Sequence, residues 1–249
     1  MTWSIIGRDE ETGAIGILVA SRAFACGSGV PYIGRRSAVA TQAFINMQWG
    51  VEGRRRLENG EDGQAVLADF IRRDGGQQIR QCHMLDTTGQ FVAHTGEHCI
   101  GWAGHRCGTM HSVAGNMLEG SDVVDATFES FANNSQAPLA ERLIAAMEAG
   151  EAAGGDKRGR QGAGLVIHKG QEWPWLDMRC DDGADPLSEL RRLLDVAKER
   201  WLLMADILPT RENFTGRTER QSFDNAVLKA EAARTAAGIK SRSYATSKK

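Results

Sequence analysis

The sequence predicts an α+β protein built as a four-layer α-β-β-α sandwich, with two stacked and largely antiparallel sheets between outer helices. Two observations lead to this expectation. Strand-like segments follow one another across short turns, which indicates hairpins rather than strand-helix-strand crossovers. Some of these strands are apolar on both faces, and amphipathic helices occur in pairs between them.

The first predicted hairpin joins residues 3–8 to residues 14–21. The intervening residues 9–13 read DEETG, and such acidic residues followed by glycine are typical of a turn. In the second strand both alternating sets of side chains are apolar, the one of Ile15, Ile17 and Val19 and the other of Gly16, Leu18 and Ala20. This pattern predicts a strand that is covered on both faces.

Helices and a second hairpin are expected next. The predicted elements are a strand at 36–41, helices at 50–59 and 62–73, strands at 79–86 and 90–95, and a strand at 110–117. The second helix is indicated by Val66, Phe70 and Arg73 at helical spacing, and Gly75-Gly76 ends it. Thr87-Thr88-Gly89 supplies the hairpin turn.

The C-terminal half repeats the alternation of helices and strands. The sequence there predicts helices at 121–133 and 138–149, strands at 162–169 and 175–180, and a long helix from Asp185 to Leu208. This last helix begins with the capping pair Asp185-Pro186, and its apolar residues recur every three or four positions. Residues 201–204, WLLM, put apolar side chains on more than one face, which indicates self-association as a homodimer.

Composition and charge restrict the function classes. The 249 residues are 41% hydrophobic and 25% charged, which is typical of a globular protein. We expect one domain at 1–208 and a basic tail at 209–249, partly ordered or docked on a partner, because nine Lys or Arg face four Asp or Glu there. The overall net charge of −2 gives no case for nucleic acid as a partner. The five cysteines form no close pairs, the chain has no signal-like start, and it has no long apolar run. These features predict a cytoplasmic protein that does not bind membranes.

Thr2 is the first candidate for catalysis. If Met1 is removed, Thr2 carries a free α-amine whose pKa of about 7.7 to 8.0 lets it act as base for its own hydroxyl. The alternative is that Thr2 is an ordinary residue of an edge strand.

Two further segments carry chemically versatile residues. The segment 94–111 contains six possible metal ligands: His94, His98, Cys99, His105, Cys107 and His111. Their spacing matches no standard metal motif. We therefore expect no metal there and favour packing and hydrogen-bonding roles for these residues. The loop 154–164, GGDKRGRQGAG, places basic side chains among glycines. It fits either an anion-binding loop or a structural loop in which Asp156 pairs with an arginine.

Five stretches taken together resemble the bacterial domain-of-unknown-function family 1028. They are MTWSIIGRDEETGAIGILVASR, AVATQAFIN, TGEHCIGWAGHR, VAGNML and AGGDKRGRQGAG, in the order of the family, and the resemblance extends to about Trp201. It implies the sandwich fold of the N-terminal nucleophile (Ntn) hydrolases, to which proteasome subunits and penicillin acylases belong. That fold agrees with the layers expected from the strand and helix pattern.

The resemblance also implies a set of site residues. Thr2 takes the place of the superfamily's nucleophile, and the strand from Arg36 to Gln42 corresponds to the segment that supplies oxyanion donors. The family motifs also contain His105, Asn116, Arg158 and Arg160, which are the expected pocket residues. The sequence departs from proteasome-type subunits in having no acidic residue beside Ser21 at the end of the second strand.

The resulting hypothesis is an amidohydrolase for a small amide or related C–N bond, with Thr2 as nucleophile and no cofactor. Asn116, Arg158, Arg160, Arg36 and Gln42 are the expected substrate-binding residues, and His105 is a second catalytic candidate. Two alternatives stay open. One is a non-catalytic ligand-binding or assembly protein that retains the fold. The other is an enzyme that needs no processing and uses His105 with a side-chain nucleophile.

Overall fold

The computed structural model describes residues 2–245. The chain divides into two compact units, one that ends at Leu190 and one that starts at Arg191. Within residues 2–245 every helix is too short or too polar to cross a membrane.

Two antiparallel sheets form the body of the first unit. Among the described residues, a six-stranded sheet has the order β10-β9-β2-β1-β8-β7 and a four-stranded sheet has the order β3-β4-β5-β6. The strands of the larger sheet are β1 (Thr2–Arg8), β2 (Ala14–Ser21), β7 (Trp102–Cys107), β8 (His111–Leu118), β9 (Gly162–Lys169) and β10 (Leu176–Cys180). Those of the smaller sheet are β3 (Pro31–Ile33), β4 (Ala38–Ala43), β5 (Arg80–Leu85) and β6 (Phe91–Thr95). The predicted α+β class with largely antiparallel sheets is confirmed.

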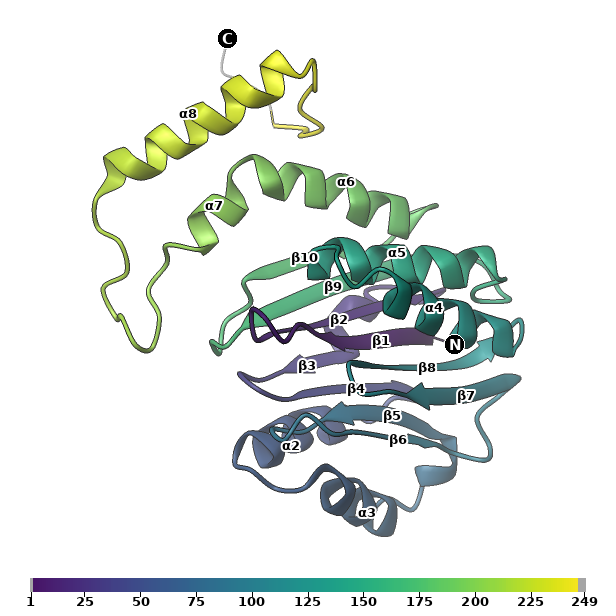
Figure 1. Cartoon of the computed structure of the whole chain (residues 1–249). Helices are drawn as coiled ribbons and strands as arrows, with labels where there is room; N and C mark the ends of the chain where they lie inside the picture. Colours follow the sequence, from purple (N-terminus) through teal and green to yellow (C-terminus); the bar gives the residue numbers. More distant parts are fainter. Residues whose placement is uncertain (1, 246–249) are drawn as a thin grey trace. The chain divides into compact units, whose positions relative to one another are not determined.

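Helices pack against both sheets (Figure 1). The helices α4 (Ser121–Asn133) and α5 (Leu139–Ala152) contact β1, β2 and β8 of the larger sheet. The helices α2 (Met47–Glu58) and α3 (Gly63–Arg73) contact strands of the smaller sheet. The approach of α4 is close enough that a Cβ at Gly7 of β1 would lie 2.6 Å from the Phe131 ring. Glycine at this position therefore permits the contact between helix and sheet.

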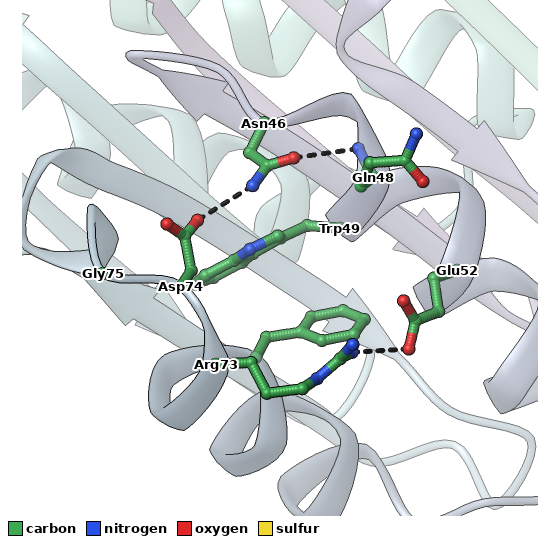
Figure 2. Close-up of a pocket in the computed structure, with 8 residues that line it drawn as sticks. Asn46, Gln48, Trp49, Glu52, Arg73, Asp74 and Gly75 are labelled. Carbon is green, nitrogen blue, oxygen red and sulfur yellow. Dashed lines mark hydrogen bonds and ion pairs between the residues drawn. The ribbon is translucent and has the colours of Figure 1, made fainter.

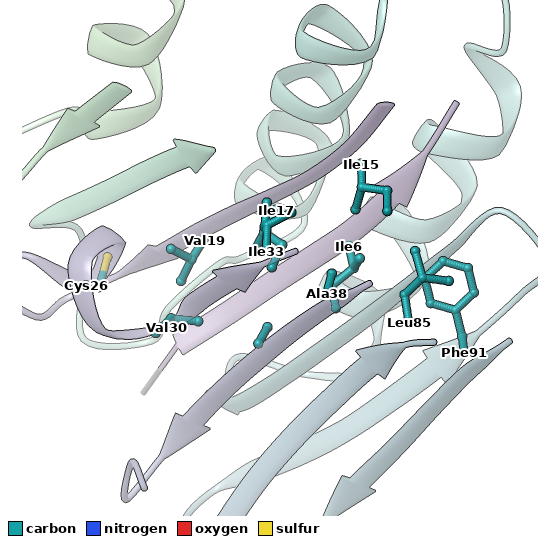
Figure 3. Packing of buried hydrophobic residues seen from close by; sticks show 11 residues of the cluster. Ile6, Ile15, Ile17, Val19, Cys26, Val30, Ile33, Ala38, Leu85 and Phe91 are labelled. Atoms are coloured by element: carbon teal, nitrogen blue, oxygen red, sulfur yellow. The ribbon is translucent and has the colours of Figure 1, made fainter. Parts of the chain in front are cut away.

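Side chains from the two sheets meet in a shared layer. The alternation of strand side chains sends Ile6, Ile17 and Leu85 into this layer, while Val39 and Met84 point to α2 and α3 on the other face of the smaller sheet. Figure 3 shows the apolar part of the layer, in which residues of β1 and β2 pack against residues of β4 and β5. Full burial of an aliphatic side chain contributes about 1.5 to 3 kcal/mol, so this cluster holds the sheets together.

Most predicted elements are found, with several differences. The short strands β3 and β7 were not predicted, and neither was the one-turn helix α1 (Cys26–Gly29). The predicted long C-terminal helix is instead α6 (Pro186–Glu199) followed by α7 (Trp201–Ala205), because Arg200 between them has non-helical φ −151°.

The second unit contains the predicted tail, which includes a helix, α8 (Arg220–Ala236). The predicted division after residue 208 falls between α7 and α8. Within this unit, Arg242 pairs with Asp195 at 2.9 Å, and the Arg192 guanidinium lies 4.0 Å from the centre of the Tyr244 ring. The segment after α8 thus contacts residues of α6.

Candidate functional site

The layer between the two sheets is polar at the end where β1 begins. Here the inward positions of the strands carry hydroxyl, amide and imidazole groups in place of aliphatic groups. They are Thr2, Ser4, Ser21, Gln42, Gln81, His83, Ser112 and Asn116, each at most 7% exposed. Buried polar groups on this scale require hydrogen-bond partners, and the layer supplies them internally.

His83 of β5 lies at the centre of one chain of hydrogen bonds. Its Nε2 is 2.8 Å from the Ser4 hydroxyl, and its Nδ1 is 2.7 Å from the Ser112 hydroxyl. The Ser4 hydroxyl donates in turn to Gln42 Oε1 at 2.7 Å. Since Ser4 gives its only proton to Gln42, Nε2 of His83 must carry a proton and Nδ1 must accept from Ser112.

This arrangement keeps the imidazole neutral. Burial, together with the nearby His105, lowers the pKa of His83 to about 3. A neutral ring with one donor and one acceptor satisfies both serine hydroxyls. His83 therefore fixes which way the Gln42 amide points.

The Gln42 and Asn116 amides converge on the backbone of Thr2. Gln42 Nε2 lies 3.3 Å from the Thr2 carbonyl oxygen, and Asn116 Nδ2 donates to the same oxygen at 3.2 Å. Both amides also donate to Gln81 Oε1, at 2.8 and 3.0 Å. Gln81 itself donates to the Gly115 carbonyl at 2.8 Å. The amides of Gln42 and Asn116, which Gln81 ties to each other, thus hold the start of β1 in one position.

The side chain of Thr2 faces a small cluster of polar groups at the ends of β1 and β2. Its hydroxyl donates to the Ser21 hydroxyl at 3.1 Å. The Asp156 carboxylate binds the residue that follows Ser21, because it accepts from the backbone N–H of Arg22 at 2.8 Å; it also accepts from the backbone N–H of Arg158 at 2.8 Å. Asp156 comes from the glycine-rich loop, so the loop supplies the acidic residue that the end of β2 lacks.

A pocket of about 250 Å³ opens next to Asn116. Its lining is mainly apolar and comes from the C-terminal ends of β4 and β8, the residue after β4 and the segments before β5 and β7. The lining residues are Ala43, Phe44, Ile79, His98, Cys99, Ile100, Asn116 and Met117. Burial raises the pKa of the Cys99 thiol, and this thiol donates to the Arg80 carbonyl at 3.4 Å. Cys99 is therefore protonated at neutral pH and is a poor nucleophile.

The sequence and the structure of the chain were compared with known proteins. A family model described as "Family of unknown function (DUF1028)" matches residues 2–190. The chain belongs to the DUF1028 family. The match ends at the same residue as the first compact unit.

A crystal structure of the DUF1028 protein SPO2555 from Silicibacter pomeroyi is similar to this chain. The two share 27% sequence identity with a TM-score of 0.80, and the match covers 88% of this chain and 96% of the other. No curated protein matches the chain significantly.

In this DUF1028 protein, His105 lies at the outer end of the polar network. Its Nδ1 is 2.8 Å from the Thr95 hydroxyl, and Thr95 accepts from Gln81 Nε2 at 2.9 Å. Burial, followed by the nearby His94, lowers the pKa of His105. His105 reaches Thr2 only through Thr95 and the amides, so the structure does not bring the two into contact.

The predicted arginines are placed in three different surroundings. Arg158 pairs with Asp156 at 3.3 Å, beside the Thr2 end of the sheets. Arg160 pairs with Glu151 and with Asp185, so it stands apart from the polar network. Arg36 lies at the other end of β4 from Gln42, where its backbone N–H donates to Glu58 at 2.9 Å. Of the expected residues, the structure thus brings Thr2, Gln42 and Asn116 together, with Arg158 nearby.

The clustered histidines have separate partners. His94 Nε2 lies 2.9 Å from the Gln77 carbonyl oxygen, and His111 Nε2 lies 3.0 Å from the Phe128 carbonyl oxygen. Among residues 2–245, no group of three or more His, Cys, Asp or Glu side chains is placed to hold a metal ion.

A second pocket lies on the outer side of the smaller sheet, between α2 and α3 (Figure 2). Its charged groups already have partners. Glu52 pairs with Arg73 at 2.5 Å, and Asp74 accepts from Asn46 at 2.8 Å and from Arg80 at 3.1 Å. These contacts join the two helices, and the pocket offers no unpaired charge to a ligand.

Sequence reasoning missed Ser4, Gln81, His83 and Ser112. A signal for them was present, because polar residues recur two positions apart at Gln81 and His83 within an otherwise apolar strand. Period-two spacing puts both on one face, and a polar pair on a buried face indicates an internal network.

Proposed function

We propose that this protein is an amidohydrolase of the Ntn type, in which removal of Met1 exposes Thr2 as the nucleophile. The observation that carries the proposal is the placement of Thr2. Its side chain lies on the inner face of a central strand, and two amides hold its carbonyl oxygen. One of these amides belongs to Asn116, a residue that also lines the pocket. Such preorganisation of a reacting residue is characteristic of catalytic sites.

The arrangement of the layers supports the same proposal. Helices contact the outer faces of both sheets, and residues of the two sheets share one buried cluster. We propose that this is the four-layer α-β-β-α sandwich of Ntn hydrolases. In that fold the terminal nucleophile lies between the sheets, as the side chain of Thr2 does here.

The chemistry needs only the residues at this end of the sheets. The Thr2 oxygen attacks the amide carbonyl carbon of the substrate, and the hydroxyl proton passes to the Thr2 α-amine. The C–N bond breaks, the departing nitrogen takes that proton, and the acyl group stays on Thr2 as an ester. Water then attacks the ester carbonyl, gives a proton to the α-amine and releases the carboxylic acid. The Thr2 hydroxyl is restored, and the net reaction consumes one amide and one water.

Neighbouring groups assist these proton transfers. The Ser21 hydroxyl, 3.1 Å from that of Thr2, orients the nucleophile and can relay its proton. The Asp156 carboxylate supplies negative charge that stabilises the ammonium form of the terminal amine. Arg158, which pairs with Asp156, is the proposed contact for a polar end of the substrate.

The test is acylation of the purified protein by a β-lactone probe, read by peptide mass spectrometry. The wild type should carry one adduct, on Thr2. Thr2→Ser should retain the adduct and Thr2→Ala should lose it, while Thr109→Ala, at an exposed threonine far along the chain, should label as the wild type does. Equal labelling of Thr2→Ala and the wild type would refute the nucleophile. Absence of labelling in all four proteins would favour the non-catalytic ligand-binding alternative.

A further inference from the structure

The chain adopts strained backbone at the end of the sheets where Thr2 lies. Among residues 2–245, the non-glycine residues with left-handed φ are Ala25 (52°), Ala43 (68°) and Met117 (53°). A non-glycine residue in this region costs about 1 to 3 kcal/mol, and such residues cluster at functional sites. Ala43 directly follows Gln42, and Met117 directly follows Asn116, so both lie next to the amides that hold Thr2.

These two strained residues line the pocket beside Asn116. The turns they produce are fixed by backbone hydrogen bonds, from Phe44 N–H to the Ile79 carbonyl at 3.2 Å and from Met117 N–H to the Ile100 carbonyl at 3.0 Å. The walls of the pocket are therefore preformed.

The rim of the pocket exposes apolar surface. Phe44 is 71% exposed and Ile100 is 69% exposed, although both are large hydrophobic residues. The backbone hydrogen bonds described above fix the main chain at both residues. Exposed apolar groups around a concave site mark a binding surface.

We infer that this pocket binds the acyl part of the substrate, and that the substrate is an amide of a compact, uncharged, apolar carboxylic acid. This inference rests on the proposed function, since it assigns the pocket to the acyl group that Thr2 would receive. Asn116 joins the two sites, because its amide donates to the Thr2 carbonyl and the residue is also part of the pocket lining.

The volume of the pocket limits the size of the acyl group. An apolar cavity of about 150 Å³ accommodates a benzene ring, so about 250 Å³ accommodates an apolar group of roughly six to ten carbon atoms. Burial of each additional methylene group should raise kcat/KM about fourfold until the pocket is full. A charged acyl group would lose its hydration among the apolar side chains of Ile79, Ile100 and Met117, and the nearby Arg80 guanidinium already donates to the Phe44 carbonyl.

The test is a series of 4-nitroanilides with acetyl, butanoyl, hexanoyl and succinyl groups, in which release of 4-nitroaniline is followed. The wild type should cleave the hexanoyl compound about sixteenfold better than the butanoyl compound, and the succinyl compound worst. Ile100→Lys should lower kcat/KM for the hexanoyl compound at least about tenfold and leave the acetyl compound within about twofold. The control is Val51→Lys, at a position on α2 that is 50% exposed and outside the pocket, and it should behave as the wild type.

The two proposals fail in different ways. Turnover that depends on Thr2 but is equal for all acyl groups, or highest for succinyl, or unchanged in Ile100→Lys, would overturn the acyl pocket and leave the nucleophile in place. Absence of turnover for every anilide, together with no β-lactone adduct on Thr2, would overturn the proposed function and the pocket assignment with it.

Discussion

The neutral, buried His83 should make the stability of the protein fall at mildly acidic pH. Its pKa is about 3 in the folded protein, against an ordinary value of about 6.5 in the unfolded chain. Below pH 6.5 the unfolded chain binds a proton that the folded protein does not bind. This contribution is therefore fully retained above pH 6.5 and is lost progressively as the pH falls toward 3.

The magnitude follows from these two pKa values. Between pH 7 and pH 5, the protonation of His83 in the unfolded chain lowers the free energy of unfolding by about 2 kcal/mol. Other titrating groups also act in this range, so the informative quantity is the difference between the wild type and a variant without the imidazole. His83→Gln keeps an N–H donor for Ser4 and removes the titration.

Urea unfolding at pH 7, 6 and 5, followed by circular dichroism, measures this difference. The wild type should lose about 2 kcal/mol more than His83→Gln between pH 7 and pH 5. His98→Gln is the matched control, because the His98 side chain is 68% exposed, and it should lose as much as the wild type. An equal loss in the wild type and His83→Gln would show that His83 titrates normally when folded, and the proposed direction of the serine and imidazole hydrogen bonds would be wrong.

Three further substitutions test the fold and the network by urea unfolding at pH 7. Ile17→Ala, at a fully buried residue between the sheets, should lower the free energy of unfolding by about 2 to 5 kcal/mol, whereas Val51→Ala on the surface of α2 should change it by less than about 0.5 kcal/mol. Asp62→Ala should cost about 1 kcal/mol, since the Asp62 carboxylate caps α3 by accepting from the Ala65 N–H at 2.8 Å; a neutral result would mean that water replaces the cap. Gln42→Leu should cost about 1 to 3 kcal/mol or more, because it leaves the buried Ser4 hydroxyl without its acceptor; a stability equal to that of the wild type would show that the network contributes nothing to folding.

The elements that the sequence predicted well carry strong periodic signals. The strand at 14–21 and the helix at 121–133 occur at the predicted bounds. In the strand, the apolar residues of both alternating sets agree with its burial on both faces. The strand β7 was missed because Gly104 and Arg106 interrupt its pattern, and its pairing with β8 contains a bulge at Trp102 and Ala103. The helix α8 was missed because it has little apolar periodicity; Phe223 is its buried residue.

The site was predictable only in part. The resemblance to the family identified Thr2, Gln42 and Asn116, which the structure brings together. The pairing of Asp156 with the end of β2 depends on a contact between residues 134 positions apart, and spacing along the chain gives no sign of it. The predicted homodimer stays a prediction, as does the role of the tail.

The mass of the intact native protein tests the central claim most directly, because the mechanism requires the α-amine of Thr2 to be free. Purified protein, expressed without any N-terminal addition, should be lighter by one methionine residue than the translated sequence. N-terminal sequencing of the same sample should begin TWSIIGRD. A protein that retains Met1 would contradict the account, because Thr2 would then have no amine to accept its proton.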